Sequence, residues 1–430
     1  MEITLKEISG LIESNNFLRA LWAELRDKFG KCDWSYQPRR INNSQTISLG
    51  SVNINQKKRI SISITYSQKT IVSKIHFGEQ FDEPLKESSE LGQQLRDAVN
   101  NAYHRRNNPD TITLHVPISS LYRSLAPYSG QWFQILPTQH PISLLSVTVK
   151  AFDQIDAEAE ALCVSSYVLD ILSVETNSLF WLLDKDEIQD ITSEIESEEL
   201  TYPEVNTFVP NEEWMMEDVP HYNEYLLISS QAVQFLDRIL SQEELSDEEK
   251  FFMRACHHFH VAREQDVLRS NQLIPVGEQK NEDESITLLM REDSRFKSAV
   301  RFSRRAEEIA TVLYMSTVEA ATKVDFNSAE KCRECGQMRY ESSARVIDYV
   351  KKYLISEEEN PIFKIFTSYY TKRSEYLHKG IVLRDHSYTR TPIPQLDTSL
   401  NFVVSQRTSV DVSILRKWIG YMLRRQLKSM

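Results

Sequence analysis

Glycine is scarce in this chain, with ten glycines among 430 residues, about 2% where ~7% is usual. No two of them lie within five positions of each other. A Walker phosphate-binding loop and a Rossmann dinucleotide turn both need closely spaced glycines, because backbone N–H groups must approach a phosphate there. The scarcity therefore argues against a nucleotide-driven motor and against a standard dehydrogenase.

Cysteines and long apolar runs are also few. The five cysteines are scattered, which fits reduced thiols better than the disulfide framework of a small secreted domain. No stretch of 18 apolar residues exists, and residues 1–16 carry three glutamates and no apolar core of signal-peptide length. We therefore expect a cytoplasmic protein without a membrane partner.

Charge is distributed unevenly along the chain. The 50 Lys and Arg against 62 Asp and Glu give a net charge of −12. Residues 184–224 hold 14 acidic residues and one lysine, whereas residues 295–430 hold 24 Lys and Arg against 15 Asp and Glu, a surplus of nine positive charges. Such asymmetry points to a partner rather than to a fold. We expect the acidic segment to be an irregular insertion and the basic C-terminal third to meet a polyanion.

Hydrophobic periodicity predicts an α+β protein. Ile60, Ile62 and Ile64 alternate with small hydroxyl residues, which is the period-two pattern of a half-buried strand. From Asp153 onward the pattern becomes helical. The predicted strands cover residues 59–66, 71–77, 111–116 and 144–149, as one small antiparallel sheet within residues 45–150, with a loop over 103–110. The predicted helices cover residues 5–29 with a break near Asn15 and Asn16, a segment from Asp153, 246–269, 295–324, 342–355, 361–379 and 409–428.

Three regions follow from this pattern. We expect an N-terminal α+β domain over residues 1–150, a helical middle region over 151–285 that contains the acidic insertion 184–224, and a helical domain over 290–430. The second boundary is placed at residues 272–285, where Pro275 and Gly277 stand among few apolar residues. The last four helices would make a small bundle, the third being bounded by Pro361 and Gly380.

The third helix of this bundle ends with a pattern that suits RNA chemistry. Arg373 and His378 lie five residues apart, which on an ideal helix leaves their side chains about 140° apart. Convergence then needs a loosened last turn or a second copy of the protein. An imidazole can exchange a proton with a ribose 2′-hydroxyl or a leaving oxygen, while a guanidinium holds the phosphate. Such chemistry needs no metal, and no cofactor is expected.

The pattern resembles the HEPN family of prokaryotic ribonuclease-type proteins. An Arg and a His separated by four to six residues late in the third helix of a basic four-helix unit is the hallmark of that family, and the string from Arg373 to Gly380 looks most like its Apea-like branch. Two further stretches are similar, one from Lys331 to Arg345 and the other the helix from Asp153. The resemblance covers roughly residues 150–180 and 295–430.

The resemblance implies a metal-independent endoribonuclease that acts in anti-phage defence or a toxin-like system. Arg373 and His378 would be the catalytic pair, in a composite site formed when two HEPN domains make a homodimer, and the product would be a cyclic phosphate. A trigger or partner protein would bind the N-terminal half. Supporting residues would be Ser374, Glu375 and Tyr376, and proximity alone suggests RNA contacts by Lys372, Lys379, Arg384 and Arg390.

A protein without ribonuclease activity is the alternative interpretation. Many active HEPN members carry Asn, Asp or His after the arginine, where this chain has Ser374. The alternative is an inactive adaptor that dimerises or binds RNA or a protein, with Arg373 a surface charge and His378 a C-terminal helix cap. Acids of the first bundle helix, Glu307, Glu308 and Glu319, either orient an arginine of the site or, as we favour, pair with Arg301, Arg304 and Arg305 on a solvated face.

Two clusters raise the question of a metal. Cys332 and Cys335 form a C-x-x-C pair, which is half of a zinc site, and we interpret them as reduced thiols in a turn. Residues 256–260 read Cys-His-His-Phe-His, where His257 and His260 share a helix face at a metal-ligand spacing. We favour half-buried polar packing for these histidines. A zinc-dependent enzyme at this cluster is the third hypothesis.

Overall fold

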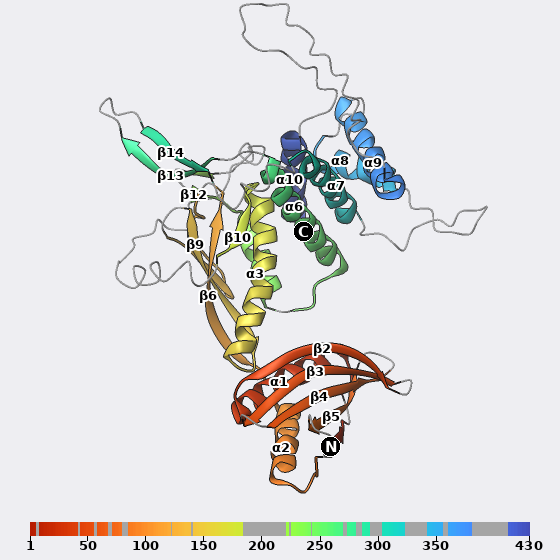
Figure 1. Ribbon diagram of the computed structural model, residues 1–430. Coiled ribbons are helices and arrows are strands. Elements are labelled where there is room, and N and C mark those ends of the chain that lie inside the picture. Colours follow the sequence, from red (N-terminus) through yellow and green to blue (C-terminus); the bar gives the residue numbers. More distant parts are fainter. Residues whose placement is uncertain are drawn as a thin grey trace, which may run out of the picture. The chain divides into compact units, whose positions relative to one another are not determined.

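The computed structural model is a mixed α+β structure with two five-stranded sheets, which confirms the predicted α+β class (Figure 1). It describes residues 1–5, 8–41, 44–55, 58–67, 71–79, 85–121, 123–138, 141–183, 221–222, 225–241, 243–269, 273–280, 286–292, 303–322, 342–355, 360–380 and 412–430. Apart from residues 221–222, the predicted acidic insertion 184–224 lies outside these ranges.

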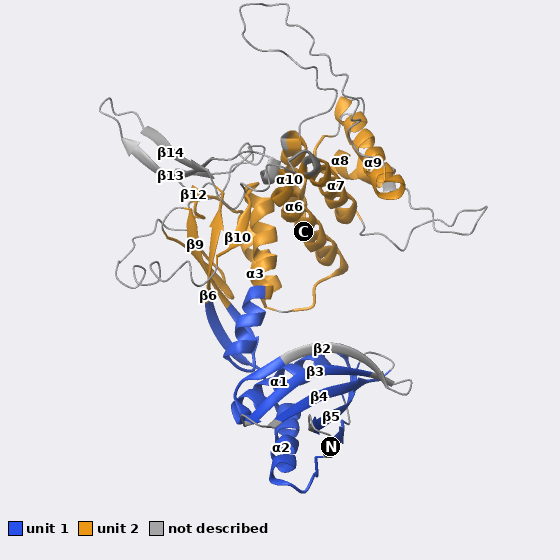
Figure 2. Cartoon of the chain, in the orientation of Figure 1, with its two compact units in different colours: residues 1–114, 148–162 blue, residues 115–147, 163–430 orange. Residues whose placement is uncertain are grey.

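Two compact units make up the chain (Figure 2). The first comprises residues 1–114 and 148–162, and the second comprises residues 115–147 and 163–430. The division passes through strands β6 (Asp110–Ser120) and β9 (Ile142–Ala151) and through helix α3 (Gln154–Thr176). This division into two compact units does not test the three domains expected at residues 1–150, 151–285 and 290–430, which remain a prediction.

The first unit is an antiparallel sheet with two helices and a core of its own. Ile60, Ile62 and Ile64 are fully buried, as their alternation predicts, and they pack with side chains of both helices. The sheet order is β1-β5-β4-β3-β2. Its elements are β1 (Glu2–Thr4), α1 (Leu11–Phe29), β2 (Cys32–Ile41), β3 (Ser44–Asn55), β4 (Lys58–Tyr66), β5 (Val72–Glu79) and α2 (Glu90–Arg105).

Both helices of this unit differ from the prediction. The break expected near Asn15 and Asn16 is wrong, because α1 runs through these residues without interruption. Burial of Phe17 and Leu21 on one face outweighs the weak helix propensity of asparagine. Helix α2 was not predicted at all, although it begins at a Ser89 N-cap and buries a helical-spaced set of residues. That set is Leu95, Ala98, Val99 and Ala102.

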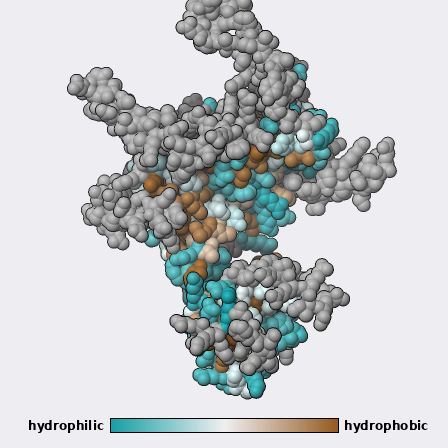
Figure 3. Space-filling view, in the orientation of Figure 1, coloured by the Kyte–Doolittle hydropathy of each residue, from teal (hydrophilic) through white to brown (hydrophobic). Residues whose placement is uncertain are grey.

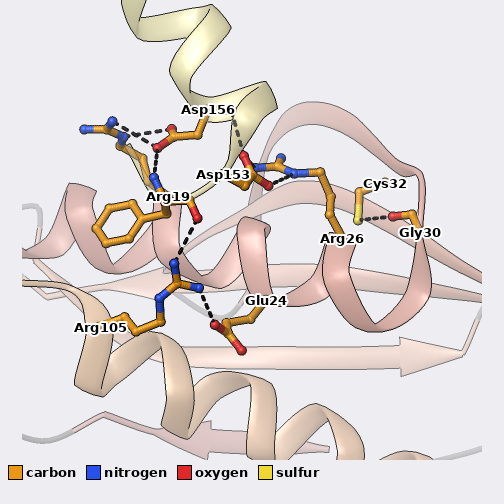
Figure 4. A network of polar contacts seen from close by, with 9 residues as sticks. Arg19, Glu24, Arg26, Gly30, Cys32, Arg105, Asp153 and Asp156 are labelled. Atoms are coloured by element: carbon orange, nitrogen blue, oxygen red, sulfur yellow. Dashed lines mark hydrogen bonds and ion pairs between the residues drawn. The ribbon is translucent and has the colours of Figure 1, made fainter. Parts of the chain in front are cut away.

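Ion pairs join α1 to the segment that opens α3 within the first unit (Figure 4). Arg19 donates to both carboxylate oxygens of Asp156, at 2.9 and 3.0 Å, and Arg26 donates to both oxygens of Asp153, at 2.6 and 2.8 Å. Arg105 of α2 reaches the Glu24 carboxylate at 2.7 Å. Paired, two-pronged contacts of this kind fix orientation as well as adding energy.

The second sheet has the order β10-β6-β9-β8-β7, so the single sheet predicted for residues 45–150 is wrong. The predicted strands 59–66 and 71–77 belong to the first sheet, and those at 111–116 and 144–149 to the second. Helix α2 separates the two sets in sequence and buries its apolar face in the first core. The remaining strands of this sheet are β7 (Tyr128–Ser129), β8 (Phe133–Pro137) and β10 (Phe180–Leu182).

Two short hairpins follow in the second unit. Strand β11 (His221–Tyr222) pairs with β12 (Tyr225–Leu226), and β13 (Leu273–Lys280) pairs with β14 (Ile286–Glu292). The boundary predicted at residues 272–285 falls largely on β13, and it remains a prediction beside the division into two compact units. Pro275 and Gly277 flank a shift of register between the two strands, which is a usual place for proline and glycine in a sheet.

The rest of the second unit is helical. The helices are α5 (Ser230–Leu240), α6 (Asp247–Arg269), α7 (Ser303–Ala321), α8 (Ser342–Tyr353), α9 (Pro361–Lys379) and α10 (Val412–Ser429). Helix α7 contacts α6, α8, α9 and α10, and α8 contacts both α9 and α10. The four predicted C-terminal helices therefore pack on one another, and α6 packs on them as well.

Hydrophilic residues cover much of the described surface on the face that Figure 3 presents, with hydrophobic residues interspersed. In the part of the chain that the structure describes, none of the helices has the length and apolar character needed to cross a membrane.

Candidate functional site

Helix α9 carries the predicted catalytic pair, and its two ends are fixed by local sequence. At the start, Asn360 accepts a hydrogen bond from the Ile362 N–H at 3.0 Å, and Pro361 occupies the first turn. At the end, Gly380 adopts a left-handed conformation with φ 67°, which favours glycine. The predicted bounds of this helix, residues 361–379, are confirmed.

Only the first half of α9 is deeply buried. Phe363, Phe366 and Tyr369 are its buried residues, and the Phe366 ring lies 5.9 Å from that of Trp418 on α10. From residue 370 to 376 the side chains are half-buried or exposed, and from Leu377 onward they are exposed. The last two turns, which contain the predicted pair, therefore lie at the surface.

Arg373 is held by helix α7. Its guanidinium forms an ion pair with the Glu319 carboxylate, and its Nε donates to the Ser316 hydroxyl at 3.4 Å. Ser316 and Glu319 are three residues apart and so share a face of α7. The Arg373 side chain is only 14% exposed, so this carboxylate restricts the guanidinium to one orientation.

We favoured solvated ion pairs within α7 for its acidic residues. This interpretation is wrong for Glu319, which pairs with Arg373 of α9. Glu308 is buried rather than solvated. The side chains of Glu307, Arg301, Arg304 and Arg305 lie outside the described residues. Ser316 was not identified from the sequence. Its spacing of three residues from Glu319, which places both on one face of a helix, was the one feature that could have indicated it.

His378 lies exposed in the last turn of α9. Within the described ranges, no hydrogen bond or ion pair joins it to Arg373. Helix α9 remains regular through Lys379, so the last turn is not loosened and the two side chains leave the axis about 140° apart. The structure thus keeps the imidazole and the guanidinium on different faces of one helix.

The supporting residues take several positions on α9. Ser374 and Tyr376 are half-buried, and Glu375 pairs with Lys379 at 3.5 Å. The Lys372 ammonium lies 5.6 Å from the centre of the Tyr369 ring. Arg384 and Arg390, which were also expected to contact RNA, lie outside the described residues, as do Cys332 and Cys335.

A buried polar cluster fixes α7 relative to its neighbours. The Asp266 carboxylate of α6 accepts hydrogen bonds from Arg263 at 2.9 Å, from the Tyr314 hydroxyl at 3.3 Å and from Arg416 at 2.7 Å. These groups come from α6, α7 and α10, and burial raises the pKa of Tyr314 above its usual range. Breaking one partner of such a cluster leaves a buried charge without compensation. The cluster therefore holds α7, and with it Glu319, in register.

Two of the three histidines in residues 256–260 lie against a buried aspartate. Asp170 of α3 lies 3.2 Å from His257 Nδ1 and 2.9 Å from His260 Nδ1, and His260 Nε2 lies 3.1 Å from the Phe180 carbonyl oxygen. His260 is buried whereas His257 is exposed. Burial raises the pKa of the neighbouring Cys256 thiol. Searched over the described residues, the chain shows no group of three or more His, Cys, Asp or Glu placed to hold a metal ion.

Comparison with known proteins finds no matching protein-family model, no significantly similar curated protein and no significantly similar solved structure.

Proposed function

We propose that this protein is a metal-independent endoribonuclease of the HEPN type, with Arg373 and His378 as its catalytic pair. The observation that carries the proposal is the fixed guanidinium of Arg373, held by Glu319 and Ser316, on a helix whose last turn exposes His378. A preorganised cation and an accessible imidazole are the two groups that RNA transesterification needs.

The reaction follows from the chemistry of these groups. His378 takes the proton of a ribose 2′-hydroxyl, and the 2′-oxygen attacks the adjacent phosphorus. The bond from phosphorus to the 5′-oxygen breaks, and that oxygen receives the proton back from the His378 imidazolium. Arg373 stabilises the negative charge that develops on the phosphate oxygens. The products are a 2′,3′-cyclic phosphate and a free 5′-hydroxyl.

A homodimer provides the convergence that one helix lacks. Arg373 and His378 diverge by about 140° on a regular helix, so one protomer's imidazole would meet the guanidinium of its partner. Mutual contacts among α7, α8, α9 and α10 support a HEPN-type bundle in this part of the chain. The proposed biological setting, anti-phage defence or a toxin-like system, depends on the family resemblance of the motif.

The direct test is cleavage of RNA by purified protein in the presence of EDTA. We expect wild-type protein to produce fragments that end in a cyclic phosphate and begin with a free 5′-hydroxyl. His378→Ala should lower the cleavage rate about 100-fold or more, because general acid–base catalysis contributes roughly 10²–10⁴ to a rate. Fragment ends are determined by their ability to accept a 5′-phosphate and by mass spectrometry.

A matched control is His104→Ala, which removes a histidine from the last turn of α2 in the other unit and should leave cleavage unchanged. Equal cleavage by wild type and His378→Ala would contradict the catalytic assignment. Retained growth inhibition on overexpression of an Arg373→Ala/His378→Ala double variant would favour the adaptor hypothesis, to which Ser374 lends some support.

A further inference from the structure

Basic side chains gather where the end of α8 meets α10. Lys351 and Lys352 occupy the last turn of α8, and both are exposed. Arg425 is exposed on α10, and its Nη1 donates to the Tyr353 carbonyl at 3.5 Å. These three residues define the α8–α10 basic surface, whose centre is Tyr353.

Aromatic rings support each cation of this surface. The Lys352 ammonium lies 4.8 Å from the centre of the Tyr353 ring, and the Lys351 ammonium lies 5.9 Å from that of Phe363. The Arg425 guanidinium lies 5.8 Å from the Tyr421 ring. Cation–π contacts hold long side chains in place while their charge stays available. The hydrogen bond to Tyr353 raises the pKa of Lys352, so this amine remains charged.

The charge balance of these helices favours an anionic partner. Helix α10 has five basic residues and no acid, and α8 has three basic residues and Asp348 alone as an acid. Arg416 and Arg424 of α10 are engaged inside the protein, since Arg416 donates to Asp266 and Arg424 donates to the Val174 carbonyl. An opposing charge comes from Glu248 of α6. Residues 342–379 and 412–429 together still carry 12 Lys and Arg against five Asp and Glu.

The surface lies at the opposite end of α9 from the catalytic pair. Lys351 contacts the ring of Phe363 in the first turn of α9, whereas His378 stands in the last turn. Fifteen residues separate Phe363 from His378, which is about 22 Å along a helix at ~1.5 Å per residue. A stacked strand at ~3.4 Å per nucleotide covers that distance with about six or seven nucleotides.

We propose that the α8–α10 basic surface binds the phosphate backbone of the RNA that is cut at Arg373 and His378, so that the preferred substrate is an RNA strand long enough to span both. The inference rests on the proposed function for the position of the cut. Backbone contacts position a nucleic acid without reading its sequence, so length and not sequence sets this preference. Exposed lysine and arginine side chains suit a single strand, because they reach its phosphates without reading its bases.

The test compares RNAs of about five and about 30 nucleotides, since only the longer spans both sites. The Lys352→Gln/Arg425→Gln variant should bind a 2′-O-methylated 30-mer more weakly, with a slope of log affinity against log salt smaller by about 1.4 for two lost phosphate contacts. The same variant should cut the unmodified 30-mer at least about tenfold more slowly at low concentration, yet cut the 5-mer as wild type does. Fluorescence anisotropy measures binding, and gel electrophoresis measures cleavage.

Lys28→Gln/Arg96→Gln is the control, because it removes one exposed lysine and one exposed arginine from the first unit. It should leave binding and cleavage unchanged. Lys352→Arg/Arg425→Lys keeps both charges and should retain binding, which excludes a folding defect as the cause of any loss.

Four outcomes would overturn the inference. They are unchanged 30-mer binding by the Gln variant, an equal loss of cleavage for both RNA lengths, an equal loss of binding by the control, and binding to vesicles containing anionic lipid in preference to RNA. If wild type cuts neither RNA, the proposed function fails, whereas a selective loss of 30-mer binding in the Gln variant still supports the surface.

Discussion

Two cations of α9, Arg373 and Lys379, differ in how their ion pairs restrict them. Arg373 is one of 24 Lys and Arg in residues 295–430, and what distinguishes it is a carboxylate from another helix. Lys379, six residues later, pairs instead with Glu375 of its own helix and is 63% exposed. A half-buried ion pair between two helices restricts a guanidinium more than a solvated pair within one helix does. Arg373 is therefore the better placed cation for a phosphate.

Glu13 gives a residue-scale prediction on pH. Its carboxylate accepts hydrogen bonds from the Ser9 backbone N–H at 2.8 Å and hydroxyl at 2.9 Å, and from Arg106 at 2.6 Å. These bonds, led by that from the Ser9 backbone, lower the pKa of Glu13 to about 2. Because the folded pKa lies below the ordinary value of 4.5, the stabilisation is complete above about pH 4.5 and is lost as the pH falls toward 2.

We expect Glu13→Gln to cost about 1 kcal/mol at pH 7, a value discounted for screening by water at this partly exposed site. The melting temperature should fall by about 2–4 °C at pH 7, and the gap to wild type should narrow at pH 3. Calorimetry at the two pH values measures both effects. Glu90→Gln, at an exposed position of α2, is the control. A gap that is constant with pH would contradict the assigned role of Glu13.

At the scale of elements, α10 packs against the end of α3 through a glycine. A Cβ added to Gly420 would overlap Oδ1 of Asn177 and come within 3.2 Å of Nη1 of Arg424. Asn177 itself has φ 53°, in the left-handed region, and Arg424 donates to the Val174 carbonyl at 2.7 Å. Burial lowers the pKa of Arg424 to about 10 and raises that of Glu175. The close approach of the two elements therefore depends on a missing side chain.

We expect Gly420→Ala to destabilise the protein by about 1–3 kcal/mol, although alanine is the better helix former by about 1 kcal/mol. Thermal unfolding followed by circular dichroism measures the change. Adding Asn177→Gly should recover part of the loss, because it removes the overlapping oxygen and because glycine tolerates a positive φ. If Gly420→Ala raised the melting temperature, the helix propensity of alanine would outweigh the overlap with Asn177. The close approach described for Gly420 would then be wrong.

Local signals predicted the elements better than their partners. Asn360, Pro361 and Gly380 fix both ends of α9 within a few residues of sequence, so this helix was predicted to the residue. The predicted strands at 59–66 and 144–149 were found for the same reason, since alternation is local. The division into two sheets was missed, because the sequence pattern of a strand does not state which strand it pairs with.

The same limit applies to the candidate site. Arg373 and His378 stand five residues apart, and their spacing could be read directly. Ser316 and Glu319 lie more than 50 residues from Arg373, and only the packing of α7 against α9 brings them together. Pro275 and Gly277 support the predicted boundary at residues 272–285, yet they also flank a register shift between β13 and β14. Only the pairing of the two strands shows that shift.

At the scale of the whole molecule, the proposed site requires more than one chain. A regular α9 directs Arg373 and His378 to different faces of the helix. A C2 dimer would bring Arg373 of one protomer next to the histidine at position 378 of its partner. Two composite sites would then form, each with an arginine from one protomer and a histidine from its partner. Both single variants, Arg373→Ala and His378→Ala, should be inactive as homodimers.

Mixing these two inactive variants should therefore restore cleavage. In a mixed dimer, the arginine of the His378→Ala protomer meets the histidine of the Arg373→Ala protomer, and the second site lacks both. Random exchange makes half of the dimers mixed with one of two sites intact, so about 25% of wild-type activity is expected. The measurement is RNA cleavage in EDTA after the variants are co-expressed, with the Arg373→Ala/His378→Ala double variant mixed with Arg373→Ala as control. If the mixture of the two single variants stayed inactive while wild-type protein cleaved RNA as a monomer, the catalytic pair would lie within one chain.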